Sequence, residues 1–438
     1  MSSSSDSSAA SISAIRKVVA SSLIGATIEW YDFFLYGVIA GLVFNKQYFP
    51  SHDPVVGTML AYATFAVGFV ARPFGGVLFG HFGDRIGRKS MLIFTLVLMG
   101  IATFLIALIP TYESIGIWAP ILLLICRVVQ GLGLGGEWGG AVLMTYEYAP
   151  KHKRGLYASL PQIGLSIGLC MAAGVVALLS ATLTDQAFSA WGWRVAFMLS
   201  AGLVFVGLYI RLTIHETPEF ARVKEANAES RIPFVEMAQR YPANIMKGMG
   251  ARYIDGVFFN IFAVFVIVYL TNTLHLNRTD ALAGVMAAAV VMCFFIPYFG
   301  ALSDRVGRTR TYMWGSLVTG FSALPAFALM HYYPDQVLIV WLAIVIPFGI
   351  FYASIYGPEA ALFCELFDTR VRYTGISFVY QFSGIFASGI TPMIATALLD
   401  ANGGQPWLIV AYTIFAGVVS AFSAWLIGRS STKPQLAY

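Results

Sequence analysis

Two carboxylates lie one helical turn apart inside a long apolar stretch near the start of the chain. Glu29 and Asp32 fall within Gly25–Gly37, which reads GATIEWYDFFLYG and contains no basic residue. A charge at the centre of a membrane helix costs about 2.5–3.5 kcal/mol, so such residues are functional candidates by default. Carboxylates bind and release protons, and this spacing puts both on nearly the same helical face. The chemistry indicated is proton handling, with Glu29 either a second proton site or a group that bonds neighbouring helices.

The composition places these acids in a membrane protein. The chain has 438 residues, of which 58% are hydrophobic and 11% are charged, and its mean hydropathy is +0.74. Soluble domains have about 25% charged residues. The apolar runs are long and continuous, and only helices or closed barrels can cross lipid, so we expect an all-α membrane protein. Four cysteines fall inside these runs without metal-type spacing, which predicts no metal site.

Twelve candidate helices follow one another along the chain. They are expected at 17–44, 55–80, 90–110, 117–147, 155–182, 191–211, 243–272, 279–301, 310–330, 336–364, 372–398 and 405–428. Nearly all loop Lys and Arg residues fall on one side of these helices, and only Lys46 and Arg278 lie in loops of the other side. Because Lys and Arg favour cytoplasmic loops, both termini are expected in the cytoplasm. The predicted organisation is a disordered cytoplasmic tail at 1–15, a six-helix bundle at 16–212, a cytoplasmic linker at 213–242, a second six-helix bundle at 243–428 and a cytoplasmic tail at 429–438.

The second half of the chain repeats features of the first. The loop GHFGDRIGRK at 80–89 returns as GALSDRVGRT at 300–309, half a chain later. Glu147 after the fourth span matches Glu365 after the tenth, at nearly the same offset. Duplicated six-helix halves are typical of transporters, which bind their substrates near the middle of the membrane between the halves.

The repeated loop charges are expected to form a gate between the two halves. A loop carboxylate can accept hydrogen bonds from backbone N–H groups at a neighbouring helix end, and the arginines can pair with the glutamates. Such contacts would hold the cytoplasmic side closed; the alternative is that these charges only set the topology. The expected gate residues are Asp84, Arg85, Arg88, Glu147, Asp304, Arg305, Arg308 and Glu365.

The doubled loop resembles the signature of the major facilitator superfamily. Within that superfamily, four segments resemble the metabolite:proton symporter family, which includes shikimate, α-ketoglutarate, citrate and proline/betaine transporters. The segments are EWYDFFLYG, FVARPFGGVLFGHFGDRIGRK, RVVQGLGLGGEWGG, and WGWRVAF followed by HETPEF. The resemblance covers nearly the whole chain. It implies two pseudo-symmetric six-helix halves in a bacterial inner membrane and uptake driven by a proton gradient.

Charges inside the expected spans indicate where proton and substrate bind. Asp32 and Arg127 lie at similar depth in the first and fourth spans, which both line the central cavity in the superfamily fold. A pair between them would act as a proton switch, since protonating Asp32 frees Arg127 for an anion; the alternative is a static pair that orients helices. Aligning the first span with the seventh matches Asp32 with Asp255, and Glu29 with Arg252. Because Arg127 and Arg252 each lack an arginine counterpart in the other half, we expect them to handle the ligand.

Two arginines in one cavity favour a carboxylate substrate, because a guanidinium binds a carboxylate through two hydrogen bonds. Arg72, in contrast, is expected to pack at the interface of the second span. The expected proton-coupling residues are Asp32, Glu29 and Asp255. The expected substrate-binding residues are Arg127, Arg252, Tyr31, Gln130, Tyr253, Asn260, Tyr356 and Gln381, with Tyr352 as a further polar candidate.

The sequence therefore predicts a monomeric importer of a small organic acid by proton symport, with no cofactor, enzymatic activity or nucleic-acid partner. The Arg252–Asp255 pair resembles the shikimate-transporter branch, with dicarboxylates close behind. The run GLGLGG at 131–136 lacks the ending of a phosphate loop and is expected to pack helices closely. The sequence contains no ring of identical pore residues, which would favour a channel. It also contains no nucleophile–base cluster, which would favour an enzyme. A proton-independent anion exchanger and a symporter of a zwitterionic osmolyte stay open.

Overall fold

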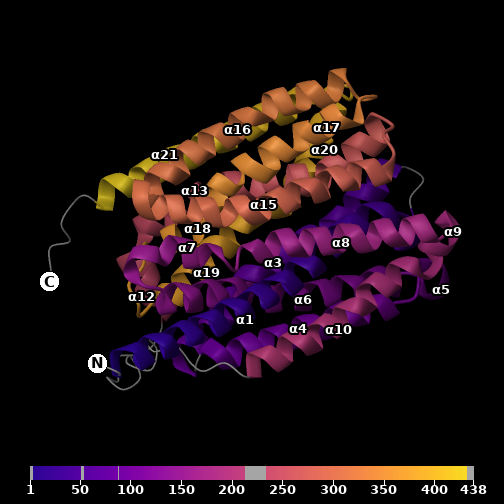
Figure 1. Ribbon diagram of the computed structural model, residues 1–438. Helices are drawn as coiled ribbons and strands as arrows, with labels where there is room; N and C mark the ends of the chain where they lie inside the picture. Colours follow the sequence, from indigo (N-terminus) through magenta and orange to yellow (C-terminus); the bar gives the residue numbers. More distant parts are fainter. Residues whose placement is uncertain (1–2, 51–53, 87, 213–232, 432–438) are drawn as a thin grey trace.

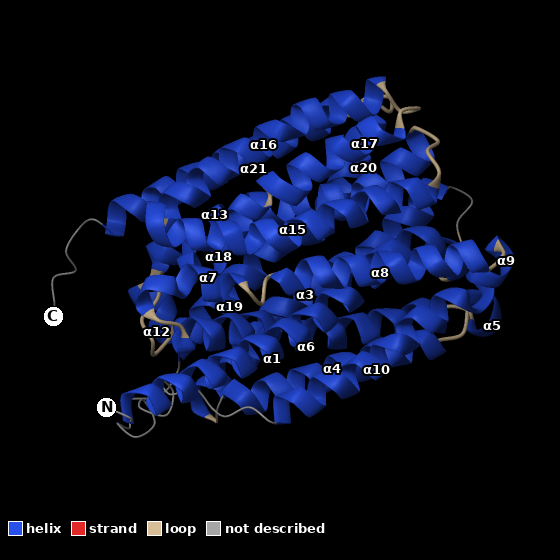
Figure 2. Ribbon diagram, in the orientation of Figure 1, coloured by secondary structure: helices blue, strands red, loops and turns tan. Residues whose placement is uncertain are grey.

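The computed structural model describes residues 3–50, 54–86, 88–212 and 233–431, and in these ranges it consists of helices and short connections without a strand (Figures 1 and 2). Twelve of the described helices are long and apolar enough to cross a membrane, as predicted. These spans are Ile15–Gln47, Met59–Gly83, Lys89–Leu108, Trp118–Tyr148, Lys151–Thr182, Asp185–Leu212, Pro242–Thr273, Arg278–Val306, Arg308–Tyr332, Val337–Cys364, Arg372–Ala401 and Trp407–Arg429.

Several spans are built from more than one helical segment, and a short π-helical segment (labelled η) often joins two α-helices. The first half contains α1 (Ser3–Ile39), η1 (Ala40–Phe44), α2 (Asn45–Gln47), α3 (Pro54–Arg85), α4 (Arg88–Leu108), α5 (Tyr112–Ile115), α6 (Trp118–Tyr148), the 3-10 turn η2 (Lys151–Lys153), α7 (Arg154–Ser159), α8 (Ile163–Thr182), α9 (Asp185–Ala187), η3 (Phe188–Gly192) and α10 (Trp193–Leu212). The second half contains α12 (Pro233–Arg240), α13 (Pro242–Asn260), η4 (Ile261–Phe265), α14 (Val266–Val268), η5 (Tyr269–Thr273), α15 (Arg278–Val306), α16 (Arg308–Tyr332), α17 (Val337–Ile344), η6 (Val345–Phe351), α18 (Ala353–Cys364), α19 (Arg372–Gly384), η7 (Ile385–Gly389), α20 (Thr391–Ala401) and α21 (Trp407–Ser431).

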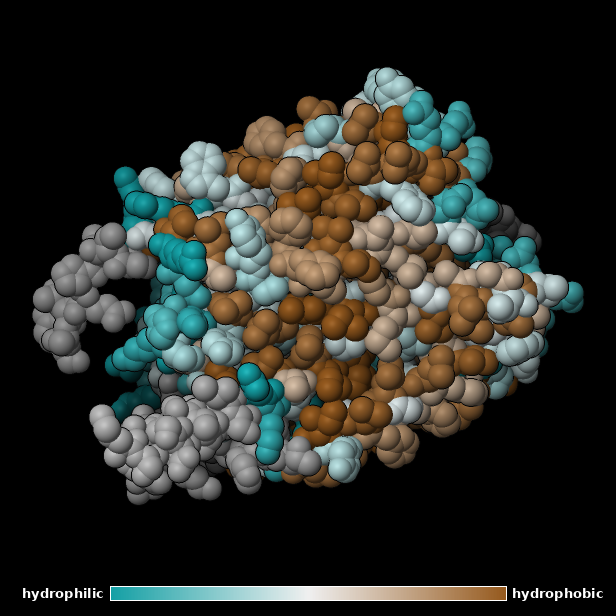
Figure 3. All heavy atoms as spheres, in the orientation of Figure 1, coloured by the Kyte–Doolittle hydropathy of each residue, from teal (hydrophilic) through white to brown (hydrophobic). Residues whose placement is uncertain are grey.

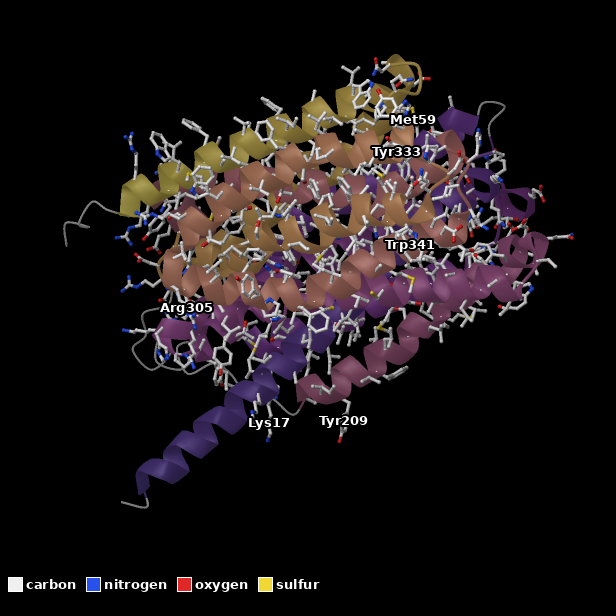
Figure 4. The ribbon with its side chains drawn as sticks, turned by 45° about the horizontal axis from the view of Figure 1, so that its top comes forward. Lys17, Met59, Tyr209, Arg305, Tyr333 and Trp341 are labelled. Carbon is white, nitrogen blue, oxygen red and sulfur yellow. The ribbon has the colours of Figure 1, made fainter. Side chains whose placement is uncertain are left out.

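The structure describes the predicted tails and linker only in part. The helix α1 begins at Ser3, so the expected disordered tail is helical from there, and its first turns project beyond the bundle (Figure 4). Extending an existing helix fixes one residue for each new hydrogen bond, which makes continuation easier than nucleation. Of the expected linker, 213–232 lies outside the described residues and the rest forms α12 and the start of α13. The last helix continues to Ser431, and 432–438 lies outside the described residues.

The two halves lie side by side, the first (indigo to magenta) below the second (orange to yellow) in Figure 1. The start of α1 and the end of α21 lie at the same end of the bundle, which we call the terminal end. Arg305 lies toward that end, whereas Tyr333 and Trp341 lie toward the other (Figure 4). An apolar belt covers the middle of the visible face, with hydrophilic residues at both ends (Figure 3). This distribution is that of a protein crossing a lipid bilayer.

The first and seventh spans are the most enclosed. In their most apolar 18-residue windows, 83% and 89% of residues are buried, against 33% in the sixth span. A helix that faces lipid must present apolar side chains, whereas a helix surrounded by other helices can carry ionisable ones. The fold thereby explains how α1 and α13 hold acids and arginines inside the membrane.

The glycine-rich run of α6 brings this helix into backbone contact with α3. A Cβ atom added at Gly75 would lie 2.0 Å from the carbonyl oxygen of Leu132, and one added at Gly135 would lie 2.1 Å from that of Arg72. No larger residue fits without separating the helices. The predicted close packing of this run is confirmed, and it fixes the position of Arg72 on α3.

Candidate functional site

A small cavity lies between the two halves near the middle of the spans. Its lining includes Arg72 of α3 from the first half, and Arg252, Asp255 and Asn260 of α13 from the second. Its volume of about 10 Å³ is about the minimum that holds one water molecule. No organic substrate fits into this space, so the halves must separate here to admit one.

Aromatic rings and irregular helix turns shape this cavity. The Phe259 ring of α13 lies 5.4 Å from the Trp30 ring and 5.1 Å from the Phe34 ring, centre to centre, which joins the first and seventh spans. The π-helical segment η4 begins directly after Asn260, and η6 ends directly before Tyr352, another lining residue. Such π turns occur frequently at functional sites because they interrupt the regular hydrogen-bond ladder.

The second half holds a cluster of three charged side chains beside the cavity. Arg252 forms an ion pair with Asp255, and its Nε lies 3.5 Å from Oε1 of Glu359 on α18. Asp255 also accepts a hydrogen bond from the Tyr352 hydroxyl. The Arg252 guanidinium lies 3.9 Å from the centre of the Tyr380 ring, a cation–π contact. All three charged side chains are buried.

In the first half, a hydrogen-bonded chain connects Asp32 with Arg127. Thr103 donates a 3.0 Å hydrogen bond to Oδ2 of Asp32, and Gln130 Nε2 donates a 2.6 Å bond to the Thr103 hydroxyl. Arg127 Nη1 donates a 3.0 Å bond to Gln130 Oε1. Both charged side chains are described, and no ion pair joins them. The direct pair expected from the sequence is thus replaced by a relay through Thr103, a residue that sequence reasoning missed.

The guanidinium of Arg127 lies away from the central cavity. It stands 4.1 Å from the centre of the Tyr36 ring, and its Nε and Nη2 atoms are buried without hydrogen-bond partners. Gly68 makes room for it, since a Cβ atom there would lie 2.5 Å from Arg127 Nε. The structure therefore places the Arg127 guanidinium outside the cavity lining. The role of Arg127 as a substrate ligand stays a prediction.

Arg72 faces the cavity instead. Its guanidinium lies 4.3 Å from the centre of the Phe69 ring and 4.9 Å from that of Phe33, and its Nε is buried without a hydrogen-bond partner. It forms no ion pair with another described side chain. The sequence contained a signal for this position: Phe69, Arg72 and Gly76 follow helical spacing, and that face of α3 meets α19 of the second half. The sequence prediction for Arg72 is packing alone.

Glu29 and Glu137 have contrasting environments in the first half. Glu29 is 3% exposed, and its Oε2 has no hydrogen-bond partner. Glu137 of α6, in contrast, is saturated: Arg211 donates to both of its oxygens, and Thr95 donates a 3.2 Å hydrogen bond to Oε2. Glu137 and Arg211 therefore form a complete buried pair between α6 and α10.

The other predicted substrate ligands divide between the cavity region and contacts elsewhere in the fold. Arg252 and Asn260 line the cavity, and Asn260 Oδ1 is buried without a partner. Tyr356 lies beside Tyr352, with ring centres 5.6 Å apart. The remaining side chains bond elsewhere: Tyr31 donates to the Ala196 carbonyl (2.7 Å), Tyr253 to the Tyr412 hydroxyl (3.3 Å), and Gln381 to the Leu134 carbonyl (3.3 Å).

At the terminal end, Asp304 connects the two halves. Its carboxylate accepts hydrogen bonds from the backbone N–H groups of Gly155 (2.8 Å) and Leu156 (3.0 Å) at the start of α7. Arg308 holds the carboxylate in place with a 3.0 Å bond and also pairs with Glu365. These are the contacts expected of the second repeated loop.

Of the other predicted gate residues, Glu147 and Arg305 have described side chains. Glu147 of the first half lies 3.6 Å from the guanidinium of Arg372 in the second, which adds another contact between halves. Arg305 is exposed. The side chains of Asp84, Arg85 and Arg88 lie outside the described part of the structure.

A stacked aromatic pair closes the interface between the cavity and these loop contacts. The Trp138 ring of α6 and the Tyr380 ring of α19 are 3.7 Å apart with an angle of 11° between their planes. Trp138 Nε1 donates to Gln162, and Gln162 donates a 2.6 Å bond to the Tyr356 carbonyl of the second half.

In the described ranges, no group of three His, Cys, Asp or Glu side chains is placed to hold a metal ion.

Two six-helix halves around a central cavity that holds buried charges are typical of a membrane transporter. The family model described as "Sugar (and other) transporter" matches residues 18–236, and that of the "Major Facilitator Superfamily" matches residues 248–437. The chain belongs to the major facilitator superfamily, as its repeated loops indicated. It is a multi-pass protein of the membrane.

Relatives within the superfamily cover nearly the whole chain. The chain is 40% identical to the shikimate transporter of Escherichia coli K12 over 428 residues, or 96% of each chain. It is 41% identical over 401 residues, 90% of each chain, to an inner membrane metabolite transport protein of the same organism. A proline/betaine transporter of that organism is 33% identical over 430 residues, 96% of this chain and 85% of that one. The xylose transporter of E. coli, in a partially occluded inward open conformation, has the same fold: its TM-score is 0.73 at 18% identity, covering 94% of this chain and 98% of that one.

Proposed function

We propose that this protein imports a small organic acid together with protons by alternating access. The observation that carries the proposal is the pair of buried arginines, Arg72 from the first half and Arg252 from the second, that line one cavity between the halves. Guanidinium groups bind carboxylates through paired, charge-assisted hydrogen bonds. A carboxylate between them would bind both halves at once, which is what a substrate that triggers closure must do.

The substrate class follows from the charge of these two arginines. A carboxylate such as shikimate suits two arginines, and the similarity to a shikimate transporter supports it. The cavity must expand to hold it, and Asn260 offers an unpaired amide oxygen to a substrate hydroxyl. A zwitterionic osmolyte is the second candidate, supported by the relative that transports proline and betaine.

Asp32 is the proton carrier in this proposal. It is 1% exposed, its Oδ1 has no hydrogen-bond partner, and its Oδ2 accepts from Thr103. The ionised carboxylate holds Thr103, Gln130 and Arg127 in their present order. Protonation removes the charge that orders this relay, because the neutral acid attracts the hydroxyl donor less strongly. The change reaches α4 and α6 through two side chains.

The terminal end is the cytoplasmic side on this proposal, because the loops there carry most of the basic residues. The Asp304 bonds to α7, the Glu147–Arg372 contact and the Trp138–Tyr380 stack then close the inner gate. Opening that gate requires all three to separate while the aromatic contacts of Phe259 keep the outer side closed.

The test is uptake into proteoliposomes under an inward proton gradient. Labelled shikimate, α-ketoglutarate, citrate and betaine are supplied separately, and internal pH is recorded. We expect one organic acid to accumulate with internal acidification. The variant Asp32→Asn should lose accumulation but keep exchange of internal for external substrate, because on this proposal the empty transporter returns only with Asp32 ionised, and asparagine cannot ionise.

Each other outcome selects a different function. Accumulation of betaine alone would make the protein an osmolyte symporter. Exchange of acids that ignores the pH gradient in the wild type would make it an anion exchanger. Accumulation that survives Asp32→Asn would remove the coupling role from Asp32 while leaving the substrate class intact.

A further inference from the structure

Glu359 of α18 is a buried carboxylate without a hydrogen bond. It is fully buried, and both of its oxygens lack a hydrogen-bond partner. Its Oε1 lies 3.5 Å from Arg252 Nε, a contact that is close enough for charge attraction but not aligned as a hydrogen bond. An ionised carboxylate in this position would be poorly compensated, since buried charges need both a counter-charge and hydrogen bonds.

Arg252 cannot compensate two acids at once. Arg252 compensates Asp255 more fully than Glu359, because Asp255 forms the closer ion pair with it. Asp255 also accepts a hydrogen bond from the Tyr352 hydroxyl. With both acids ionised, the cluster carries one positive and two negative charges. Ionising both of two carboxylates that share one site costs free energy. The carboxylate with fewer stabilising contacts therefore takes up a proton more readily. The geometry makes Glu359 that residue.

The first half provides an internal comparison. Aligning the fourth span with the tenth matches Glu137 with Glu359. Glu137 receives hydrogen bonds from Arg211 and Thr95, so its two oxygens are satisfied. The glutamate at this position therefore joins two helices in the first half, whereas in the second half its carboxylate has no hydrogen bond. An unsatisfied buried acid beside the cavity is not required by the repeat architecture.

The groups around Glu359 come from three further helices and its own. They are Arg252 on α13 with its ion-pair partner Asp255, Tyr312 on α16, Tyr380 on α19, Tyr356 on α18 itself, and Tyr352 directly before it. Arg252 is the only cation of this set, so its position decides the charge that Glu359 can bear. Any ligand that takes Arg252 away changes the proton affinity of Glu359.

We propose that Glu359 carries a second coupling proton, taken up when the substrate carboxylate engages Arg252. The inference rests on the proposed function, because it needs a carboxylate substrate. The carboxylate of the substrate replaces Glu359 beside the guanidinium, and the proton from the outer solution then neutralises Glu359. With Asp32 as the first carrier, a monocarboxylate anion crosses with two protons, and each transport cycle moves one net positive charge inward.

Charge movement tests this directly. Shikimate uptake into proteoliposomes is measured with and without an inside-negative potassium diffusion potential, at equal pH on both sides. We expect the potential to raise wild-type uptake several-fold. Glu359→Gln should make uptake insensitive to the potential while a pH gradient still drives it, since one proton and one anion then cross together. Glu359→Asp should keep the sensitivity.

The outcomes separate this inference from the proposed function. Wild-type uptake that follows the pH gradient but ignores the potential would overturn the inference and leave the symporter intact. Glu359→Gln protein that transports and still responds to the potential would also overturn it. If Glu359→Gln does not fold, the wild type and Glu359→Asp decide: both must respond to the potential. Failure of the wild type to take up shikimate or any other acid of the panel would refute the proposed function itself.

Discussion

The guanidinium of Arg252 lies 3.9 Å from the centre of the Tyr380 ring. That ring stacks on Trp138 of the other half, with ring centres 3.7 Å apart. A cavity residue is thus connected through one aromatic ring to a contact that holds the two halves together. A substrate that draws Arg252 toward itself would weaken the support of this ring. The arrangement gives substrate binding a physical route to the inner gate.

Removing the Trp138 ring should loosen the gate. An aromatic pair contributes about 0.5–1.5 kcal/mol beyond its buried area, so Trp138→Ala should raise the population of the state open at the terminal end by about two- to tenfold. The readout is the rate at which N-ethylmaleimide labels a cysteine placed at Ser159, which is fully buried in α7, in a chain whose native cysteines are replaced by serine. Trp138→Phe keeps a ring and should label slowly. Equal labelling rates in Trp138→Ala and the wild type would contradict the role of the stack.

A methyl group at Gly155 should keep the halves apart. Its Cβ would lie 2.6 Å from the Gly300 carbonyl oxygen and 2.8 Å from an oxygen of Asp304, so the closed interface cannot form as it is. We expect Gly155→Ala to reduce uptake at least tenfold and to increase labelling at Ser159→Cys. Gly202→Ala is the matched control, because no atom lies within 4 Å of the added Cβ and the residue is inside a helix. It should transport normally and be slightly more stable to heat. Normal uptake by Gly155→Ala would show that this contact is not part of the cycle.

Loss of the Arg72 guanidinium should weaken substrate binding. Hydrogen bonds to a charged group contribute about 1.5–3 kcal/mol each, so Arg72→Ala should raise KM for the organic acid by about ten- to hundredfold. Arg72→Lys keeps the charge but not the paired donors and should fall between. Lys46→Ala removes a cation from an exposed position and controls for the change in net charge. An unchanged KM in Arg72→Ala, measured by initial uptake rates, would place the carboxylate elsewhere.

Thr103 should tune the pH dependence of transport. Thr103→Val has nearly the same shape but removes the donor to Asp32, which destabilises the ionised carboxylate relative to the neutral acid. The pH at which uptake falls to half of its maximum should therefore rise by up to about one unit. A hydrogen bond contributes about 0.5–1.5 kcal/mol net, and a shift of one pH unit corresponds to about 1.36 kcal/mol.

The control is Thr103→Ser, which retains the hydroxyl and should follow the wild type. In an Asp32→Asn background, where exchange is the transport that remains, Thr103→Val should leave the pH dependence of exchange unchanged, because the group that it influences no longer titrates. A shift that persists there would mean that Thr103 acts on another acid.

The architecture could be predicted because it depends on local composition. Continuous apolar runs require helices in lipid, and the repeated loops at 80–89 and 300–309 revealed the two halves before any contact was known. Asp32, Arg252 and Asp255 were recognised for a similar reason: a charge inside an apolar run is costly wherever it lies. These inferences need only the identity of a residue and its neighbours along the chain.

The partners of those charges could not be predicted, because they come from other helices. Whether an intramembrane arginine faces a cavity or an aromatic pocket depends on the rotation of its helix, which packing against several neighbours decides. Gly135 lets α6 approach α3 and so sets Arg72 toward the second half, while Gly68 opens the space that takes Arg127 out of the cavity. The sequence by itself determined that this is a two-half membrane transporter with buried acids and arginines. Only the tertiary structure decided that Arg72 and Arg252 line one cavity, that Thr103 and Gln130 separate Asp32 from Arg127, and that Glu359 is left without a hydrogen bond.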